Sequence, residues 1–312
     1  MPSLPDSLAA GPIVIDGGLG TLLEHNGHDL SSPLWSARLL AQEQDAIRDA
    51  HRQFFDAGAR VAITSSYQVG YDQMAAAAGL DVADVDRLLV RSVRLAREAR
   101  DDAGLTTENA WVAASVGPFG ASRADGSEYT GDYDLGMAEL RSWHRRRMRT
   151  LAAEGPDLIA VETIPSLTEL EAVCRELDGL GARAWISVTV AGGALRTGES
   201  LRDAFAIAAS VPEVLAVGVN CCAVSEIPAA LAALRSVTDK PGVVYPNSGE
   251  HWHADTRTWS GTAGSLAGSA ADWVSGGAAF VGGCCRVGPS EITDIAGRLA
   301  ATRDASPAPS LD

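Results

Sequence analysis

The sequence predicts a (β/α)8 barrel, because short apolar runs alternate with helical patterns along 312 residues and polar residues end several of the runs. Eight apolar runs are expected to form strands, and they cover residues 13–16, 61–67, 111–117, 158–163, 185–190, 214–221, 243–246 and 279–285. Uninterrupted apolar runs are typical of parallel strands that are buried on both faces. A doubly wound open sheet is the alternative architecture.

Helical patterning fills the segments between these runs. It is clearest over residues 41–57, 82–100, 135–154, 167–180 and 227–237. No linker rich in Pro, Gly or Ser interrupts the alternation before the last residues. The sequence therefore predicts a single barrel domain over residues 1–304 and a flexible tail over residues 305–312.

The formal net charge of −15 makes nucleic acid and anionic membranes poor partners. The arginines of residues 145–149 fall in a helical stretch and are expected on its solvated face, and His25, His28, His51 and His144 are also expected at the surface. No apolar run reaches the roughly 20 residues of a membrane-spanning helix, and the first residues do not resemble a signal peptide. A cytoplasmic location is expected.

Polar residues occur where the predicted strands end. Asp16, Thr64, Glu162 and Asn220 each lie in the last part of such a strand or close to its end. In a parallel barrel these carboxyl ends meet at one rim, where barrel active sites are built. The sequence therefore predicts one site at this rim, although a strand-end polar residue can also serve only as a turn, a cap or a structural ion pair.

Cysteines end two of the same predicted strands. Three thiolates that leave a fourth position open can hold Zn²⁺ and still admit a substrate atom. Cys284 and Cys285 follow Gly282 and Gly283, which allow both sulfur atoms to face inward. Of Cys221 and Cys222, one is expected to face the metal and the other to pack, and the spacing leaves open which.

Other cysteines and histidines give competing interpretations. A buried free cysteine can be simple packing, and Cys174, inside a helical pattern, is expected to be structural. His251 and His253 follow the seventh strand and could reach the rim, although alternating side chains in a polar loop are typical of a surface.

Several motifs along the whole chain resemble the homocysteine S-methyltransferases, particularly the branch that uses S-methylmethionine. The motifs are the segments 16–21, 33–37, 62–68, 115–118, 126–133, 161–163, 218–221, 245–250 and 282–286. The most specific are Gly-Val-Asn-Cys at 218–221 and Gly-Gly-Cys-Cys at 282–285. The resemblance implies that Cys221, Cys284 and Cys285 bind zinc, which leaves Cys222 as a neighbour.

The resemblance also implies the substrates. Residues expected to hold the amino and carboxylate ends of homocysteine are Asp16, Gly17, Thr64 and Glu162, with Asn220 as a weaker candidate. The expected partner of homocysteine is a small cationic methyl donor, and the choice among S-methylmethionine, S-adenosylmethionine and another donor stays open. Three aromatic residues, Trp35, Tyr67 and Tyr129, are candidates for contact with its sulfonium, with plain packing as the alternative.

Methyl transfer from a sulfonium to a thiolate requires no general acid, because a neutral sulfide leaves. Zinc would provide the thiolate, which a free thiol with a pKa near 8.5 mostly lacks at neutral pH. Two other functions remain open: a metal-free barrel hydrolase with a cysteine nucleophile and a base such as His253, and a protein in which zinc is purely structural. A monomer or a small homo-oligomer is expected.

Overall fold

Eight parallel strands form the centre of the protein in a computed structural model that describes residues 3–30, 35–253 and 258–305. In chain order they are β1 (Ile13–Val14), β2 (Val61–Ile63), β3 (Trp111–Val116), β4 (Leu158–Ile164), β5 (Ala184–Val188), β8 (Val214–Asn220), β9 (Gly242–Tyr245) and β12 (Ala278–Val281). The order in the sheet is β1-β12-β9-β8-β5-β4-β3-β2, and every pairing is parallel. Successive strands of this set are therefore neighbours in space.

The sheet closes on itself between β1 and β2. Ile15, directly after β1, forms a parallel bridge with Val61. The backbone N–H of Arg60 donates to the carbonyl of Val14 at 2.7 Å, and the N–H of Asp16 donates to the carbonyl of Val61 at 3.0 Å. These contacts join the two ends of the strand order, so the (β/α)8 barrel is confirmed and the open sheet was the wrong alternative.

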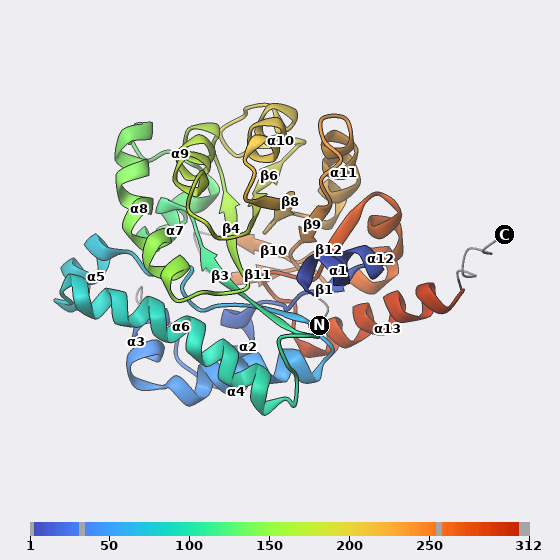
Figure 1. Cartoon of the computed structure of the whole chain (residues 1–312), viewed down its shortest axis with the longest axis horizontal. Coiled ribbons are helices and arrows are strands. Elements are labelled where there is room, and N and C mark those ends of the chain that lie inside the picture. The colour runs from blue at the N-terminus through green and yellow to red at the C-terminus, as the bar shows by residue number, and fades with distance from the viewer. Residues whose placement is uncertain (1–2, 31–34, 254–257, 306–312) are drawn as a thin grey trace.

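Helices surround the strands, as Figure 1 shows. They are α1 (Leu4–Ala10), α2 (Leu19–His25), α3 (Trp35–Gln42), α4 (Gln44–Asp56), α5 (Tyr71–Ala78), α6 (Val82–Asp102), α7 (Phe119–Arg123), α8 (Met137–Ala153), α9 (Leu167–Leu177), α10 (Leu201–Ser210), α11 (Ile227–Arg235), α12 (Leu266–Ser275) and α13 (Pro289–Ala305), with short 3-10 helices η1 (Ser127–Tyr129) and η2 (Val224–Glu226). Side-chain caps fix several starts. Ser166, for example, accepts a hydrogen bond from the backbone of Glu169 at the start of α9.

Two separate apolar layers result from the alternation of side chains along the strands. One lies between strands and helices, and the other fills the barrel interior with bulky groups such as Trp111, Trp185 and Phe280. The rings of Trp185 and Phe280 pack with centroids 5.2 Å apart. Leu4 of α1 joins this interior cluster, so α1 closes the barrel end at which the strands begin.

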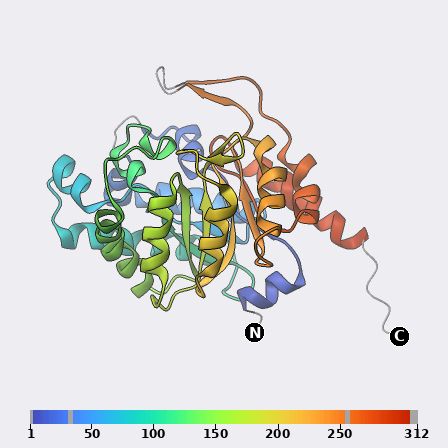
Figure 2. The same ribbon diagram turned by 90° about the horizontal axis from the view of Figure 1, so that it is seen from above.

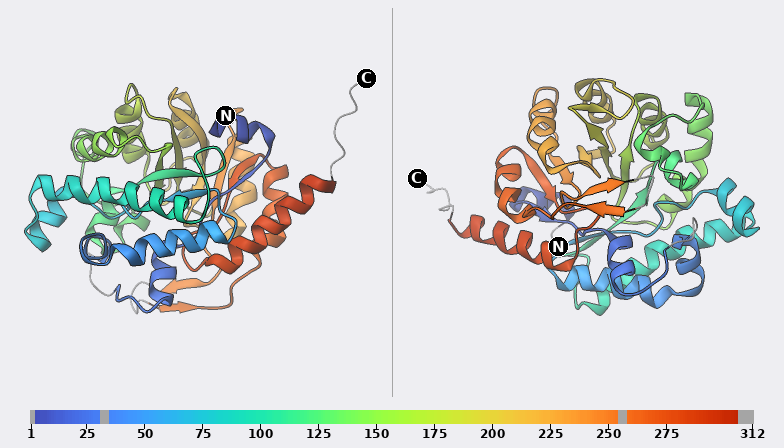
Figure 3. Two further views of the ribbon diagram at one scale, coloured as in Figure 1. Left: turned by 60° about the horizontal axis from the view of Figure 1, so that its bottom comes forward. Right: turned by 180° about the vertical axis from the view of Figure 1, so that it is seen from behind.

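Two antiparallel pairs interrupt the βα alternation. β6 (Val190–Ala191) pairs with β7 (Ala194–Leu195) after β5, and β10 (His251–His253) pairs with β11 (Thr258–Ser260) after β9. Both follow the carboxyl end of a barrel strand and therefore lie at the rim. Figures 2 and 3 show β10 and β11 (orange) at the end of the molecule opposite α1.

Most strands end before their predicted last residue; β1, for example, ends at Val14, so Asp16 lies in the loop that follows it. β2 ends at Ile63 and β12 ends at Val281, so Thr64, Cys284 and Cys285 lie in the loops that follow their strands. The glycines at 282 and 283 explain the early end of β12, because the backbone turns there toward β1. The N–H of Gly283 donates to the carbonyl of Asp16 at 3.1 Å.

Three polar helical residues predicted at the surface are instead fully buried: His51, His144 and Arg147. On α8, residues 144 and 147 occupy the inward stripe between Leu140 and Leu151. Of the tail predicted over 305–312, only Ala305 lies within the described residues, as the last residue of α13, and the division at residue 304 remains a prediction. Within the described ranges no helix combines the length and apolarity that crossing a bilayer requires.

Candidate metal and substrate site

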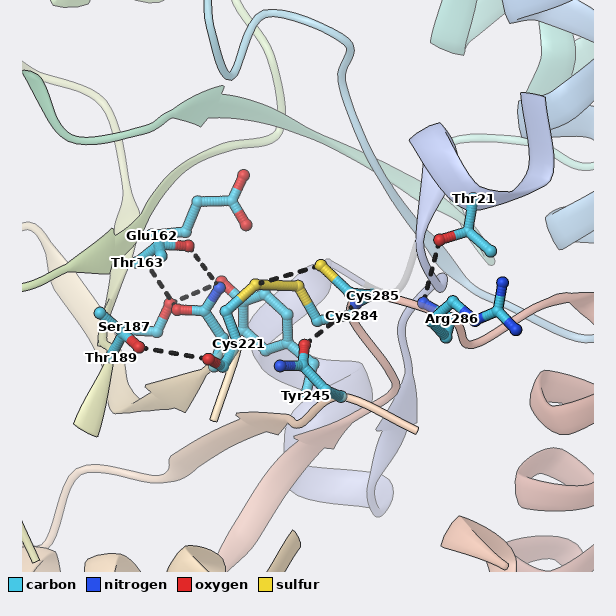
Figure 4. Close-up of a disulfide and its surroundings, with 12 residues drawn as sticks. Thr21, Glu162, Thr163, Ser187, Thr189, Cys221, Tyr245, Cys284, Cys285 and Arg286 are labelled. Atoms are coloured by element: carbon cyan, nitrogen blue, oxygen red, sulfur yellow. Dashed lines mark hydrogen bonds between the residues drawn. A yellow bond between two sulfur atoms is a disulfide. The ribbon is translucent and has the colours of Figure 1, made fainter. Parts of the chain in front are cut away.

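Three cysteine sulfur atoms converge at the rim of the barrel. Cys221 follows β8, and Cys284 and Cys285 follow β12; their Sγ atoms all lie within 4.8 Å of one another. Figure 4 shows the three side chains pointing toward one another from two loops. Among the side chains that the structure describes, no other group of three or more His, Cys, Asp or Glu has this convergence.

Backbone contacts of the two loops bring these sulfur atoms together. The N–H of Cys221 donates to the carbonyl of Tyr245 at 3.2 Å, and the N–H of Cys284 donates to the carbonyl of Pro246 at 2.8 Å. The N–H of Cys285 donates to the Oδ1 atom of Asn247 at 3.2 Å. Both cysteine loops are therefore tied to the residues that end β9.

Glycine allows the closest approach in this arrangement. A Cβ atom at Gly283 would lie 2.2 Å from the side chain of Val287, and one at Gly17 would lie 2.3 Å from the carbonyl of Val287. Heavy atoms do not approach this closely, so neither position accepts a side chain without movement of the loop. Gly17 thus serves the packing of the first loop against the loop that carries Cys284.

The separation of the Cys221 and Cys285 sulfur atoms fits a metal site. Cys221 and Cys284 are joined by a disulfide in the structure, with 5.6 Å between their Cα atoms, and Sγ of Cys285 lies 4.0 Å from Sγ of Cys221. Tetrahedral thiolates around zinc, each about 2.3 Å from the ion, are separated by about 3.8 Å.

The sequence did not predict the disulfide between Cys221 and Cys284. Because a disulfide sulfur is no thiolate, binding a metal through all three residues requires its reduction.

The two remaining cysteines pack in the layer between strands and helices. Cys222 is 1% exposed and Cys174 is 5% exposed, and burial raises the pKa of each thiol to about 12. This arrangement resolves which member of the adjacent pair faces the rim. It is Cys221, whose φ of 48° is left-handed and turns the chain out of β8.

Two buried carboxyl groups, Asp16 and Glu162, lie at this rim, close enough for their charges to repel each other. Oδ2 of Asp16 accepts a hydrogen bond from the N–H of Ile63 at 2.8 Å, but Oδ1 is buried without a partner among the described residues. Burial, opposed by that bond and reinforced by the charge of Glu162, raises the pKa of Asp16 well above its usual range. Burial also raises the pKa of Glu162 to about 7, although Ser115 donates to it. Such a pair favours a cationic ligand group.

Thr64 and Asn220 have side chains that tie strands together. Oγ1 of Thr64 accepts from the N–H of Ser115 at 3.0 Å. Asn220 forms two 2.7 Å bonds with Thr163: Oδ1 accepts from the Thr163 N–H, and Nδ2 donates to its hydroxyl oxygen. Because Thr163 has a φ of 61°, Asn220 stabilises an unfavourable backbone conformation directly beside Glu162. Both residues lie at the predicted rim, and both act there on the backbone.

Of the aromatic candidates, Tyr67 and Tyr129 lie at the site. Tyr67 hydrogen bonds with the side chain of Thr163, and Tyr129 hydrogen bonds with Cys285. Burial raises the pKa of both phenols, so both remain neutral. Trp35 is the first residue of α3, and its side chain lies outside the described part of the structure, as do the side chains of His251 and His253.

Residues around the site that the sequence did not reveal include Ser115, Thr163 and Tyr245. Tyr245 lies at the end of β9, where its hydroxyl accepts from Nε1 of Trp185 at 3.2 Å and also hydrogen bonds with Glu162. Its position next to the last residue of the strand predicted over 243–246 was a usable signal. Tyr245 therefore links the interior core to a carboxylate at the rim.

Arg147 of α8 connects two rim loops through hydrogen bonds to their backbone carbonyls. Its guanidinium donates to the carbonyls of Gly117 at 2.8 Å, Ser66 at 3.0 Å and Tyr67 at 2.7 Å. These carbonyls belong to the loops that follow β3 and β2. The arginine is 0% exposed, so water does not replace it.

We expect Arg147→Met to lower the free energy of unfolding by about 3 kcal/mol, because three carbonyl groups lose their donor inside the protein. Arg149→Met, an exposed position on the same helix, is the matched control and should change it by less than about 0.5 kcal/mol. Urea unfolding of both variants measures the difference. Equal stabilities would show that the loops do not depend on this arginine.

Fold and site together define a barrel enzyme with a thiol cluster suited to a soft metal and a carboxylate pair beside it. The family model described as homocysteine S-methyltransferase matches residues 13–299. The chain therefore belongs to the homocysteine S-methyltransferase family, and this prediction from the motifs is confirmed.

Individual relatives agree with the family assignment. Homocysteine S-methyltransferase YbgG of Bacillus subtilis is 42% identical over 294 residues, which cover 91% of this chain and 93% of the relative. The metallated form of homocysteine methyltransferase MmuM from Escherichia coli superposes with a TM-score of 0.82 at 39% identity, covering 92% of this chain and 96% of that one. The oxidized form of MmuM gives the same TM-score and coverages at 40% identity.

Proposed function

We propose that this protein transfers a methyl group from a small sulfonium donor to the sulfur of homocysteine and so forms methionine, with Zn²⁺ bound by Cys221, Cys284 and Cys285. The observation that carries the proposal is the convergence of three sulfur atoms within 4.8 Å at the rim of the barrel. Soft thiolate ligands favour zinc over Mg²⁺ or Ca²⁺. Bound zinc would supply the reaction with a deprotonated homocysteine thiol at neutral pH.

Asp16 and Glu162 are the proposed partners of the homocysteine ammonium group. A cation between them would give the unpaired Oδ1 of Asp16 a donor and would offset the repulsion of two buried carboxylates. Gly17 and Thr64 are proposed near the carboxylate of the substrate. Asn220 is proposed to act through Thr163 and thus to position Glu162.

The charge of the site favours a cationic methyl donor. With zinc bound, the +2 of the ion, −3 from the three cysteine thiolates and −1 from the homocysteine thiolate would leave −2 at the metal centre. The attack of a thiolate on a sulfonium neutralises part of this charge as a neutral sulfide leaves. Tyr67 and Tyr129 are proposed to lie against the donor. We propose S-methylmethionine as the donor, with S-adenosylmethionine as the alternative.

Membership in the family favours this reaction over the two other functions considered. A cysteine hydrolase needs a base beside its thiol. The base considered for that function, His253, has its side chain outside the described residues, so the family assignment is what favours the methyltransferase. A closed structural zinc site needs four ligands, and three sulfur atoms converge here. A cytoplasmic location and a monomeric or small homo-oligomeric state remain predictions.

The test is to reduce the protein with a phosphine, supply zinc, remove the excess and measure zinc per chain and methionine formed from homocysteine. We expect about one zinc per chain and faster methionine formation with S-methylmethionine than with S-adenosylmethionine. Zinc bound without methionine formation from either donor would favour a structural zinc site. A protein that holds no zinc after this treatment would contradict the proposed site.

A further inference from the structure

Two charged side chains at the rim, Glu128 and Arg196, take no part in the site as described so far. Glu128 lies in η1, in the loop after β3, and Arg196 directly follows β7, in the loop after β5. Tyr129 connects the two, because it follows Glu128 in the chain and its ring contacts Arg196. Its hydroxyl hydrogen bonds with Cys285, and Cζ of Arg196 lies 5.4 Å from the centroid of its ring. Both loops therefore reach the sulfur cluster through Tyr129.

Arg196 has a guanidinium without a carboxylate partner. Its Nε donates to Oγ1 of Thr189 at 3.4 Å, and Thr189 in turn donates to the carbonyl of Cys221. Within the described residues it forms no ion pair, whereas many other arginines of this acidic chain do. Its side chain is only partly exposed. The two terminal nitrogen atoms remain available for a planar, two-pronged contact with a carboxylate.

Glu128 has the complementary property. Its Oε2 atom is buried and has no hydrogen-bond partner among the described residues. Burial raises the pKa of this carboxyl to about 7; a hydrogen bond from its own backbone opposes the rise, and the charge of Asp125 adds to it. Its charge acts on Tyr67, Tyr129 and Cys285, which places the carboxylate on the side of the site where the donor is proposed to lie. Buried oxygens of this kind normally have a donor.

The loop that carries Glu128 is fixed. A Cβ atom at Gly120 would lie 2.4 Å from the backbone nitrogen of Glu128, so α7 and η1 pack directly against each other. The N–H of Tyr129 donates to the carbonyl of Gly126 at 3.0 Å, and Gly126 has a φ of 85° that suits glycine. Glu128 and Arg196 form no ion pair with each other, so a ligand would not have to separate them.

We propose that Glu128 and Arg196 bind the two charged ends of an amino-acid methyl donor, Glu128 its α-ammonium and Arg196 its α-carboxylate. This subsite rests on the proposed function and adds a second zwitterion site to the one formed around Asp16 and Glu162. It requires a donor with both groups. A quaternary ammonium carboxylate without N–H groups would satisfy Arg196 and leave Glu128 unpaired.

The test pairs substitutions with donors that lack one charge. The donors are S-methylmethionine, its decarboxylated analogue (3-aminopropyl)dimethylsulfonium and its deaminated analogue 4-(dimethylsulfonio)butanoate. The variants are Arg196→Met and Glu128→Gln. Arg183→Met and Glu108→Gln, both exposed in loops that precede barrel strands, are the controls. For each, the KM of the donor, the KM of homocysteine, kcat and bound zinc are measured.

We expect Arg196→Met to raise the KM of S-methylmethionine by about 10- to 100-fold and to leave the KM of the decarboxylated analogue at the wild-type value. Glu128→Gln should show the same pattern with the deaminated analogue. The KM of homocysteine and the zinc content should stay unchanged in both variants. The assignment would be overturned if the KM rose equally for the complete donor and for the analogue. A raised KM of homocysteine or a loss of zinc would also overturn it.

Direct binding separates this inference from the reaction itself. Calorimetric titration of the zinc-loaded wild type and of Arg196→Met with S-methylmethionine requires no turnover. A wild type that binds the donor more tightly than the variant but forms no methionine would contradict the proposed function and support the subsite. Equal affinities in the two proteins would contradict the subsite, whatever the activity.

Discussion

Replacing Cys285 by alanine is expected to remove both bound zinc and activity, with a fall in the rate of methionine formation of about 1000-fold or more. Cys285 is the member of the cluster that remains a free thiol when Cys221 and Cys284 are joined. Two sulfur ligands do not hold the metal as three do, and homocysteine would then meet no ion that removes its thiol proton. Zinc per chain and initial rates after reduction measure the effect.

Cys222→Ala is the matched control for this variant. The residue is adjacent to Cys221 but packs between strands and helices, so its loss should leave zinc and kcat near the wild-type values at a small cost in stability. Loss of zinc in Cys222→Ala, or full zinc and activity in Cys285→Ala, would mean that the ligands are assigned wrongly.

Glu162→Gln is expected to weaken homocysteine binding and to stabilise the protein at the same time. The carboxylate is the proposed partner of the substrate ammonium, so the KM of homocysteine should rise by about 10- to 100-fold above pH 7. The KM of the wild type should itself fall as the pH rises through about 7, where the buried carboxyl ionises. The variant should lack this pH dependence.

The stability effect follows from the pKa of Glu162, which burial raises from 4.5 to about 7. The folded protein favours the protonated form, so this group's contribution to stability is complete below pH 4.5 and is lost as the pH rises to about 7. Glutamine does not ionise and avoids that loss. Above pH 7 the variant should therefore be more stable by on the order of 2 kcal/mol, with a Tm higher by roughly 5 °C.

Thermal unfolding at pH 5 and pH 8 measures this difference, and the stabilisation should be larger at pH 8. Glu98→Gln, an exposed position on α6, is the control and should shift neither Tm nor the KM of homocysteine. A Glu162→Gln variant that is less stable at pH 8 than the wild type would show that hydrogen bonds to the carboxylate outweigh its burial.

The strands of the barrel were predictable from sequence because each is a short run of apolar residues bounded by polar ones. The rim was predictable for the same reason, since the polar residue that ends such a run marks its carboxyl end. The loops were not. β6, β7, β10 and β11 are short pairs after β5 and β9, and they have no apolar run of their own. Arg196 owes its position to one of these insertions.

Buried polar groups were the other source of error. His144 and Arg147 were expected at the surface because of their polarity, and the correct signal was their spacing from Leu140 and Leu151 on one helical stripe. The positions of Cys284 and Cys285 depend on the local packing of Gly283 against Val287 and on the bond from Gly283 to the carbonyl of Asp16, a contact between distant segments that no local pattern encodes.

Asp16 also bears on how the barrel opens. Its side chain accepts the Ile63 N–H at the junction where a single bridge, Ile15 with Val61, closes the ring of strands. The Asp16 carboxylate, which is proposed to bind the homocysteine ammonium, thus takes the place of a strand carbonyl as the acceptor of the Ile63 N–H. Local unfolding that separates β1 from β2 would break the homocysteine pocket, and bound homocysteine would in turn slow hydrogen exchange at the Ile63 amide. Homocysteine binding and closure of the barrel between β1 and β2 are then thermodynamically coupled.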